Sequence, residues 1–129
     1  MNSELHKNER LHSKKLIKEL FDKGSSFFLY PFKVMVLEIN FDIPETNQVL
    51  FSVSKKKLKK AVDRNLIKRR MREAYRLNKQ ILGEMAEGKK IIGLIYVSSE
   101  IVTFQVIETK IKKILTTIKE KPLSDKNHP

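Results

Sequence analysis

The stretch QVLFSVSKKKLKKAVDRNLIKRRMREAYRLNKQIL, residues 48–82, joins a predicted strand to a long predicted helix. In the strand, Val49, Phe51 and Val53 point to one side of the chain and alternate with less apolar residues. The residues that point to the opposite side are Leu50, Ser52 and Ser54. This alternation predicts a sheet that helices cover on one face and that is more open on the other.

The helix is predicted from about Ala61 to Leu82, and Gly83 and Gly88 bracket its end. A further strand is predicted at Ile91–Val97. Parallel strands need a crossover connection of a dozen or more residues, which is usually a helix. We therefore expect the strand at Gln48–Ser54 to lie parallel to the strand at Ile91–Val97.

The predicted central helix has two contrasting faces, because its polar face is almost entirely cationic. At about 100° per residue, one row of cations repeats along the helix at every fourth position. The row is Arg64, Lys68, Arg72 and Arg76, with Asn65, Arg69 and Lys79 beside it. The apolar arc on the opposite side is Val62, Leu66, Ile67, Met71, Ala74, Leu77 and Ile81. Arg70 falls inside this arc, so it must extend to solvent, pair with an acid or mark a bend.

The charge of the chain is concentrated in this segment. The chain has 27 Lys and Arg against 15 Asp and Glu, which gives a formal charge of +12. Between Lys55 and Lys79, only Asp63 and Glu73 oppose a dense series of cations. Glu73 is expected to pair with Arg69, Arg76 or Arg70. Such a row favours a phosphate-bearing partner over a solvated helix face. A membrane surface is disfavoured because the other face of the helix is needed for the core. Charge alone does not separate RNA from DNA.

The remaining elements complete one domain, residues 1–120, followed by a tail at 121–129 that we expect to be disordered. A first helix is predicted from a Ser13 cap to Lys23, with Gly24 as a left-handed stop. The other predicted elements are strands at Phe27–Tyr30 and Val34–Phe41, a hairpin loop at 40–47, and a last helix at about Val102–Lys119 with Ser98 and Ser99 as caps. Ile101, Phe104, Ile107, Ile111, Leu115 and Ile118 form the core stripe of that last helix. The order α-β-β-β-α-β-α predicts an α+β fold, a two-layer α-β sandwich.

Several functional classes are excluded. The chain has no cysteine, so it has no disulfide, no cysteine nucleophile and no thiolate metal site. No apolar run approaches the roughly 20 residues that span a bilayer, and the N-terminus has no apolar signal core, so a cytoplasmic protein is expected. His6, His12 and His128 lack partners at metal-ligand or catalytic spacing. The polypeptide is therefore predicted to hold neither catalytic residues nor a metal.

Two segments carry a resemblance to a known family. Ser52–Lys56 followed by Ala61–Arg76 resembles the bacterial ribonuclease P protein subunit, which has an FSVSKK strand end and then an AVxRNxxKRxxRE helix. The N-terminal pattern of that family, RL and then F-x-x-V-F-x-x-G, is also similar. The matching residues here are Arg10, Leu11, Ile17, Leu20, Phe21 and Gly24. The resemblance covers roughly residues 10–119.

The resemblance implies an accessory subunit of a ribonucleoprotein endonuclease. Its partner would be a catalytic RNA that holds Mg²⁺ and removes the 5′ leader of precursor tRNA. It also implies a left-handed βαβ crossover, against the usual right-handed preference. Residues implied to contact the catalytic RNA are Arg64, Asn65, Lys68, Arg69, Arg72 and Arg76. Residues implied to hold the leader in a groove are Ile17, Phe21, Ser52, Ser54, Lys55 and Lys56, with Met35 as a further candidate.

The sequence departs from the family pattern at three places. Ile17 replaces an aromatic residue, Leu50 replaces a glycine, and the linker Lys57–Lys60 has one residue more than the family's and no glycine. We therefore expect a different strand-to-helix turn. The alternative hypothesis is a structural RNA-binding protein of the ribosomal type. A DNA-binding helix module is disfavoured because no helix-turn-helix partner precedes the basic helix. No protein partner is evident.

Overall fold

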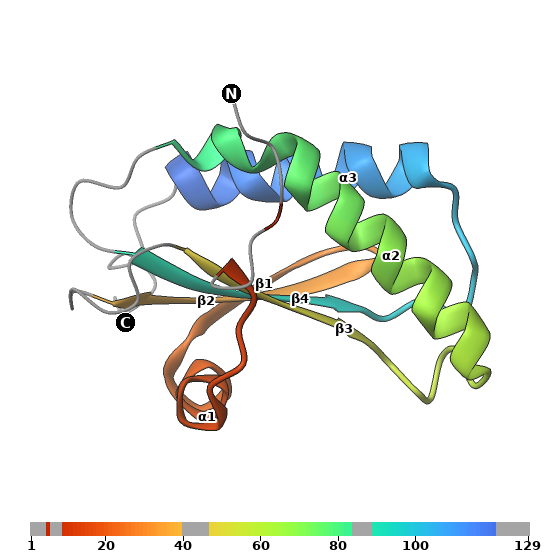
Figure 1. The fold of residues 1–129 in the computed structure, drawn as a ribbon, viewed down its shortest axis with the longest axis horizontal. Helices are drawn as coiled ribbons and strands as arrows, with labels where there is room; N and C mark the ends of the chain where they lie inside the picture. Colours follow the sequence, from red (N-terminus) through yellow and green to blue (C-terminus); the bar gives the residue numbers. More distant parts are fainter. Residues whose placement is uncertain (1–4, 6–8, 40–46, 84–88, 121–129) are drawn as a thin grey trace.

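The computed structural model describes residues 5, 9–39, 47–83 and 89–120, which form one four-stranded sheet and three α-helices. The sheet order is β1-β2-β4-β3. Helices α2 and α3 cover one face of the sheet, and α1 lies on the opposite face (Figure 1). The elements are α1 (Lys14–Lys23), β1 (Ser25–Leu29), β2 (Phe32–Ile39), β3 (Gln48–Val53), α2 (Ala61–Asn78), the 3₁₀ helix η2 (Lys79–Leu82), β4 (Lys89–Tyr96) and α3 (Phe104–Glu120). The predicted α+β class and element order are confirmed.

The pairing of the last two strands confirms the predicted crossover. Strand β3 pairs with β4 in parallel, with Gln48 opposite Ile91 and Val53 opposite Tyr96. The other pairs, β1 with β2 and β2 with β4, are antiparallel. The connection between β3 and β4 therefore returns through α2, as parallel pairing requires. The left-handedness of this crossover stays a prediction.

The main core lies between the sheet and the pair α2 and α3. Val49 and Val53 are buried in it, Phe51 packs against it, and Leu50 packs on the other side of the sheet, as the alternation predicts. Helix α2 contributes Ile67 and Met71, each fully buried. Burying one such side chain stabilises the fold by roughly 1.5–3 kcal/mol, so this layer fixes the orientation of α2 on the sheet.

A second apolar cluster lies under α1. Leu20 is fully buried there against Met35 and Ile91. A Cβ atom on Gly93 would lie 3.1 Å from Leu20 Cδ2, so the glycine allows α1 to approach β4 closely. Helix α1 is thereby seated over the middle of the sheet, and Leu11 of the N-terminal segment packs in the same cluster.

The prediction of Gly24 as a left-handed stop is wrong. Gly24 has φ −68° and ψ 154°, which is extended backbone, because the chain runs directly from α1 into β1. The glycine is needed for another reason: a Cβ atom would lie 2.5 Å from the Leu20 carbonyl oxygen. The Ser13 cap is confirmed, since its side chain accepts a hydrogen bond from the Leu16 N–H.

The predicted start of the last helix is also corrected. Helix α3 begins at Phe104, and the Thr103 hydroxyl, not a serine, accepts a hydrogen bond from the Val106 N–H at 3.3 Å. Ser98 does not cap α3. Its hydroxyl accepts a hydrogen bond from the Glu100 N–H in the segment that precedes the helix. Ile101 precedes the helix and is 45% exposed, so it is not part of the core stripe.

The apolar arc predicted for α2 is only partly correct. Val62 is 69% exposed and Leu77 is 38% exposed. At about 100° per residue, Val62 lies on the opposite side of α2 from the fully buried Met71, so its side chain faces away from the core. The buried residues of α2 are Ile67, Met71, Ala74, Tyr75 and Asn78. The helical segment ends as η2 at Gly83, whose φ of 69° supports the predicted stop.

The early strands are displaced by about two residues from their predicted positions. Strand β1 begins at Ser25 and β2 at Phe32, because the turn between them falls at Tyr30 and Pro31. Residues 40–46 of the loop predicted at 40–47 lie outside the described residues, as do Gly88 and the predicted disordered tail at 121–129.

Candidate nucleic-acid interface

The turn that joins β3 to α2 is built around Leu58. Leu58 is 5% exposed and packs in the main core, and its N–H donates to the Ser54 carbonyl at 3.0 Å. The lysines around it, Lys55, Lys56, Lys57, Lys59 and Lys60, are all exposed. The turn therefore places five ammonium groups in solvent around one apolar anchor. This is how the longer, glycine-free linker is accommodated.

The Arg64 side chain is hydrogen-bonded to the backbone of the turn that precedes α2. Its Nη1 donates to the Leu58 carbonyl at 2.9 Å and to the Lys59 carbonyl at 2.8 Å. These two bonds satisfy carbonyl groups of the turn before α2. The guanidinium of Arg64 thus positions the lysine-bearing turn.

Arg70 resolves the exception in the apolar arc. Its Nη1 donates to the Val102 carbonyl at 2.5 Å, so the side chain joins α2 to the segment before α3. Arg70 was predicted to extend to solvent, to pair with an acid or to mark a bend. Its partner is instead a backbone carbonyl. The role of Arg70 is structural and lies on the far side of α2 from the cationic row.

The other residues of the cationic row differ in exposure. Asn65 and Arg69 are exposed, whereas Lys68 and Arg72 are half-buried. Arg76 pairs with Glu73, with Nη2 to Oε2 at 2.5 Å and Nε to Oε1 at 3.1 Å. Glu73 was expected to pair with Arg69, Arg70 or Arg76, and Arg76 is the partner. The Arg76 guanidinium holds the pKa of the Glu73 carboxyl below its usual range.

The N-terminal segment brings a further arginine to this surface. The Leu11 N–H donates to the Val49 carbonyl at 3.0 Å, and Arg10 forms a parallel bridge with Val49. Lys79 Nζ lies 2.9 Å from the Glu9 carboxylate, and both side chains are largely buried. Residues 9–11 are thereby fixed beside β3 and the end of α2. Arg10 was quoted in the sequence pattern, but no binding role was predicted for it.

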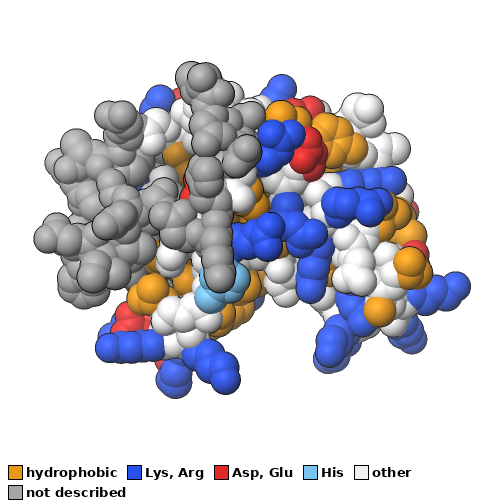
Figure 2. Space-filling model, in the orientation of Figure 1, with side chains coloured by type: hydrophobic (Ala, Val, Ile, Leu, Met, Phe, Trp, Pro, Cys, Tyr) orange, Lys and Arg blue, Asp and Glu red, His pale blue; other side chains and the backbone are white. Residues whose placement is uncertain are grey.

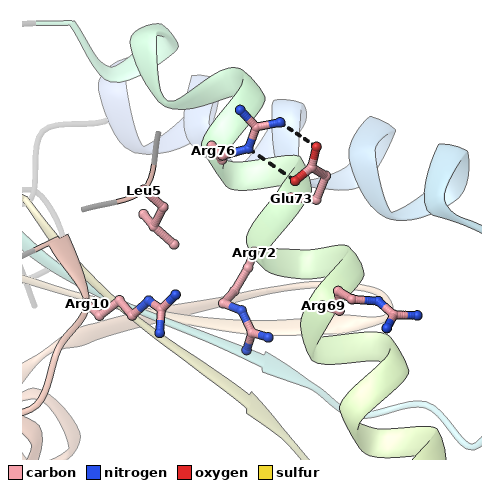
Figure 3. A pocket seen from close by; sticks show the side chains of 6 residues that line it. All are labelled: Leu5, Arg10, Arg69, Arg72, Glu73 and Arg76. Atoms are coloured by element: carbon pink, nitrogen blue, oxygen red, sulfur yellow. Dashed lines mark hydrogen bonds and ion pairs between the residues drawn. The ribbon is translucent and has the colours of Figure 1, made fainter. Parts of the chain in front are cut away.

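A cleft of about 450 Å³ opens where this segment meets α2. Its lining is Leu5, Arg10, Arg69, Arg72, Glu73 and Arg76. Arg10 and Arg72 extend from opposite sides toward the same space, while the Arg76 guanidinium turns to Glu73 (Figure 3). We call this set of side chains the arginine cleft.

The electrostatics of the arginine cleft favour an anion. Burial lowers the pKa of Arg72, and the nearby Arg10 and Arg69 lower it further. The guanidinium nevertheless stays charged at neutral pH, because its reference pKa is so high. Three like charges around one space repel each other, and a phosphate group between them would relieve that repulsion. Each guanidinium can also donate two parallel hydrogen bonds to phosphate oxygens.

The face of the sheet that carries α1 holds the predicted leader residues. Ile17 is half-buried against the cluster under α1, and Phe21, one turn later, is 48% exposed. Ser52 and Ser54 are half-buried, while Lys55 and Lys56 are exposed. In Figure 2, Lys and Arg side chains stand on both sides of an indentation between α1 and the start of α2. Met35 is 6% exposed beneath α1, so its candidacy as a leader contact is corrected.

The described part of the chain contains no group of three or more His, Asp or Glu side chains that could hold a metal ion. Within the same residues, no helix is both long and apolar enough to cross a membrane. His12 is exposed, and the other two histidines lie outside the described ranges.

A family model, related sequences and solved structures all show similarity between this chain and ribonuclease P proteins. The family model described as Ribonuclease P matches residues 5–119. A Porphyromonas gingivalis protein named ribonuclease P protein component is 36% identical over 117 residues, which cover 88% of this chain and 85% of that protein. The Staphylococcus aureus RNase P protein structure superposes with a TM-score of 0.70 at 26% identity, covering 86% of this chain and 95% of that one. The Thermotoga maritima RNase P protein gives 0.67 at 26% identity, covering 84% and 96%.

Fold, surface charge and similarity together define a small α+β RNA-binding protein. The chain belongs to the ribonuclease P protein family. Membership of this family makes it a component of a ribonuclease and connects it with tRNA processing.

Proposed function

We propose that this chain is the accessory protein subunit of ribonuclease P and binds the catalytic RNA through the arginine cleft and the exposed face of α2. In this proposal the RNA carries out the chemistry and holds the Mg²⁺ ions. The reaction is endonucleolytic removal of the 5′ leader from precursor tRNA. The protein acts in the cytoplasm, where it binds the precursor tRNA. The polypeptide contributes binding and positioning.

The observation that carries the proposal is a cleft that Arg10, Arg69 and Arg72 line, with Arg10 and Arg72 extending toward the same space. Arg10 comes from the N-terminal segment, and the other two come from α2, so the folded chain creates the cluster. Glu9 and Lys79 fix the two elements to each other. Because the fold already places these arginines around one cleft, RNA binding does not have to order the backbone that carries them.

The leader part of the proposal rests on the open face of the sheet. Phe21 offers an exposed aromatic ring, and Lys55 and Lys56 offer cations at the end of β3. Aromatic rings beside cations are typical of sites for single-stranded RNA. Ile17 supplies apolar contact instead of a ring, so Phe21 is the stacking candidate on α1.

The salt dependence of RNA binding tests the phosphate contacts. For Arg69→Gln, we expect the slope of log affinity against log salt to become shallower by about 0.7–0.9 for each lost phosphate contact, because fewer counterions are released. Filter binding or titration with a bacterial ribonuclease P RNA over a range of KCl concentrations measures the slope. The matched control is Lys113→Gln, which removes an exposed cation from α3 and should leave the slope unchanged. An unchanged slope for Arg69→Gln would exclude a direct contact.

A further inference from the structure

Strand β1 and the turn after it present two exposed aromatic rings. Phe28 is 60% exposed and Tyr30 is 55% exposed, and their ring centroids are 6.2 Å apart with a 53° tilt. A single exposed aromatic side chain is ordinary on a protein surface. Two neighbouring rings at the edge of a sheet form a larger apolar platform, which we call the β1 platform.

The strand register places Phe28 on the same face of the sheet as α1. Ser26 pairs with Met35, and Phe28 pairs with Lys33. Directly paired residues of antiparallel strands point to the same face. Met35 packs in the cluster under α1, so Phe28 and Lys33 belong to that face as well. Phe28 therefore lies on the face that carries Ser52, not on the face covered by α2 and α3.

One row of side chains crosses all four strands at this level. Phe28 lies opposite Lys33, Lys33 opposite Ile95, and Ile95 opposite Ser52. With neighbouring strands about 4.8 Å apart, Phe28 and Ser52 are about 14 Å apart across the sheet. Helix α1 is seated over the adjacent row, where Leu20 contacts Gly93. The row from Phe28 to Ser52 therefore crosses the sheet beside α1, and its Ile95 packs against the cluster under that helix. We call this row the track.

Tyr30 is held in place by a hydrogen bond. Its hydroxyl donates to Ser98 Oγ at 3.0 Å, and Ser98 is only 2% exposed. Ser98 Oγ in turn accepts from the Glu100 N–H at 3.0 Å. The Tyr30 ring is therefore anchored at its polar end and can support the neighbouring Phe28 ring from a fixed position.

The chemistry of the track favours RNA over an apolar protein partner. Lys33 is exposed in the middle of the row, and Lys55 and Lys56 are exposed beyond Ser52. An apolar protein interface is depleted in lysine at its core. Two aromatic rings at one end of the row, with ammonium groups along it, instead match the bases and phosphates of a single strand. The formal charge of +12 adds a long-range attraction for a polyanion.

We propose that the β1 platform is a second stacking site for the 5′ leader, so that the leader path runs across the sheet from Ser52 to Phe28 and Tyr30. This inference rests on the proposed function and extends it, because the predicted leader residues end at α1 and β3. Phe28 stacks on a base, Tyr30 buttresses that ring, and Lys33 pairs with the phosphate between the two ends. The bound class is single-stranded RNA.

The test uses the reconstituted holoenzyme and a series of precursor tRNAs whose leaders are shortened one nucleotide at a time. Phe28→Leu keeps an apolar side chain but removes the π-face. It should weaken binding of long-leader precursors by about 5- to 100-fold and leave mature tRNA unaffected. Phe28→Tyr should retain wild-type affinity. Val106→Ala, at a residue of α3 that is 41% exposed, is the control and should change neither substrate.

The outcomes separate this inference from the function on which it rests. If wild-type holoenzyme prefers long leaders and Phe28→Leu keeps that preference unchanged, the β1 platform is not a leader site, and a protein-facing surface becomes the better account. Equal weakening of precursor and mature tRNA would also overturn the inference, because it would indicate damage to folding or assembly. If wild-type holoenzyme shows no preference for a leader, the leader part of the proposed function fails too.

Discussion

Replacing Arg10 and Arg72 together by glutamine is expected to weaken binding of the catalytic RNA by about 100- to 10,000-fold. A hydrogen bond to a charged group is worth about 1.5–3 kcal/mol, and two such contacts are lost. Arg10 enters the arginine cleft from the N-terminal segment, and Arg72 enters it from α2. A phosphate bound between them therefore needs both segments in their folded positions. Equilibrium binding to a bacterial ribonuclease P RNA at fixed salt measures the loss.

The control for this double variant removes two cations elsewhere. Lys112 and Lys113 are exposed on α3, and replacing both by glutamine changes the net charge equally. That variant should lose far less affinity. A similar loss in both double variants would mean that net charge, rather than the arginine cleft, attracts the RNA. Because relief of like-charge repulsion stabilises the free protein, urea unfolding of Arg10→Gln/Arg72→Gln should show no loss of stability.

Leu58→Ala is expected to lower the free energy of unfolding by about 2–5 kcal/mol, although the residue lies in a turn. Leu58 is 5% exposed, and the turn around it is otherwise made of exposed lysines. Without the anchor, a cavity remains in the core, and the Leu58 and Lys59 carbonyls that Arg64 binds lose their fixed positions. Urea denaturation monitored by circular dichroism measures the change.

Val62→Ala is the matched control for Leu58→Ala, since Val62 is close in the chain but 69% exposed. Its effect on unfolding should stay within about 0.5 kcal/mol. If Leu58→Ala were equally mild, the turn would not depend on its apolar anchor. The positions of Lys55 and Lys56 would then have to be set by other contacts.

Patterns within one element predicted most of the fold. The alternation of Val49, Phe51 and Val53 identified the covered face of β3, and the length of the connection predicted the parallel pairing with β4. Two details of the helices were predicted wrongly. The predicted apolar arc of α2 was too wide, because the part of it that faces the core centres on Met71 and leaves Val62 on the other side of the helix. The conformation of Gly24 follows from the immediate start of β1.

The candidate site was also predicted only where its residues lie on one element. The cationic row of α2 follows from spacing along one helix. The role of Arg10 does not, because it depends on the bridge to Val49 and on the ion pair between Glu9 and Lys79. Arg64 also lies in the predicted row, yet its guanidinium is bound to carbonyl oxygens of the turn. Spacing predicts which side chains share a face, whereas partners such as these carbonyls require the tertiary structure.

Cleavage of precursor tRNA by a bacterial ribonuclease P RNA at low Mg²⁺, with and without this protein, tests the central claim most directly. We expect efficient cleavage only when both are present, because the cationic surface screens phosphate repulsion and the open sheet face positions the leader. Protein alone should give no cleavage. Absence of stimulation by a protein that still binds RNA would contradict the accessory-subunit account and favour a structural RNA-binding role. Cleavage by the protein alone would contradict the assignment of the chemistry to the RNA.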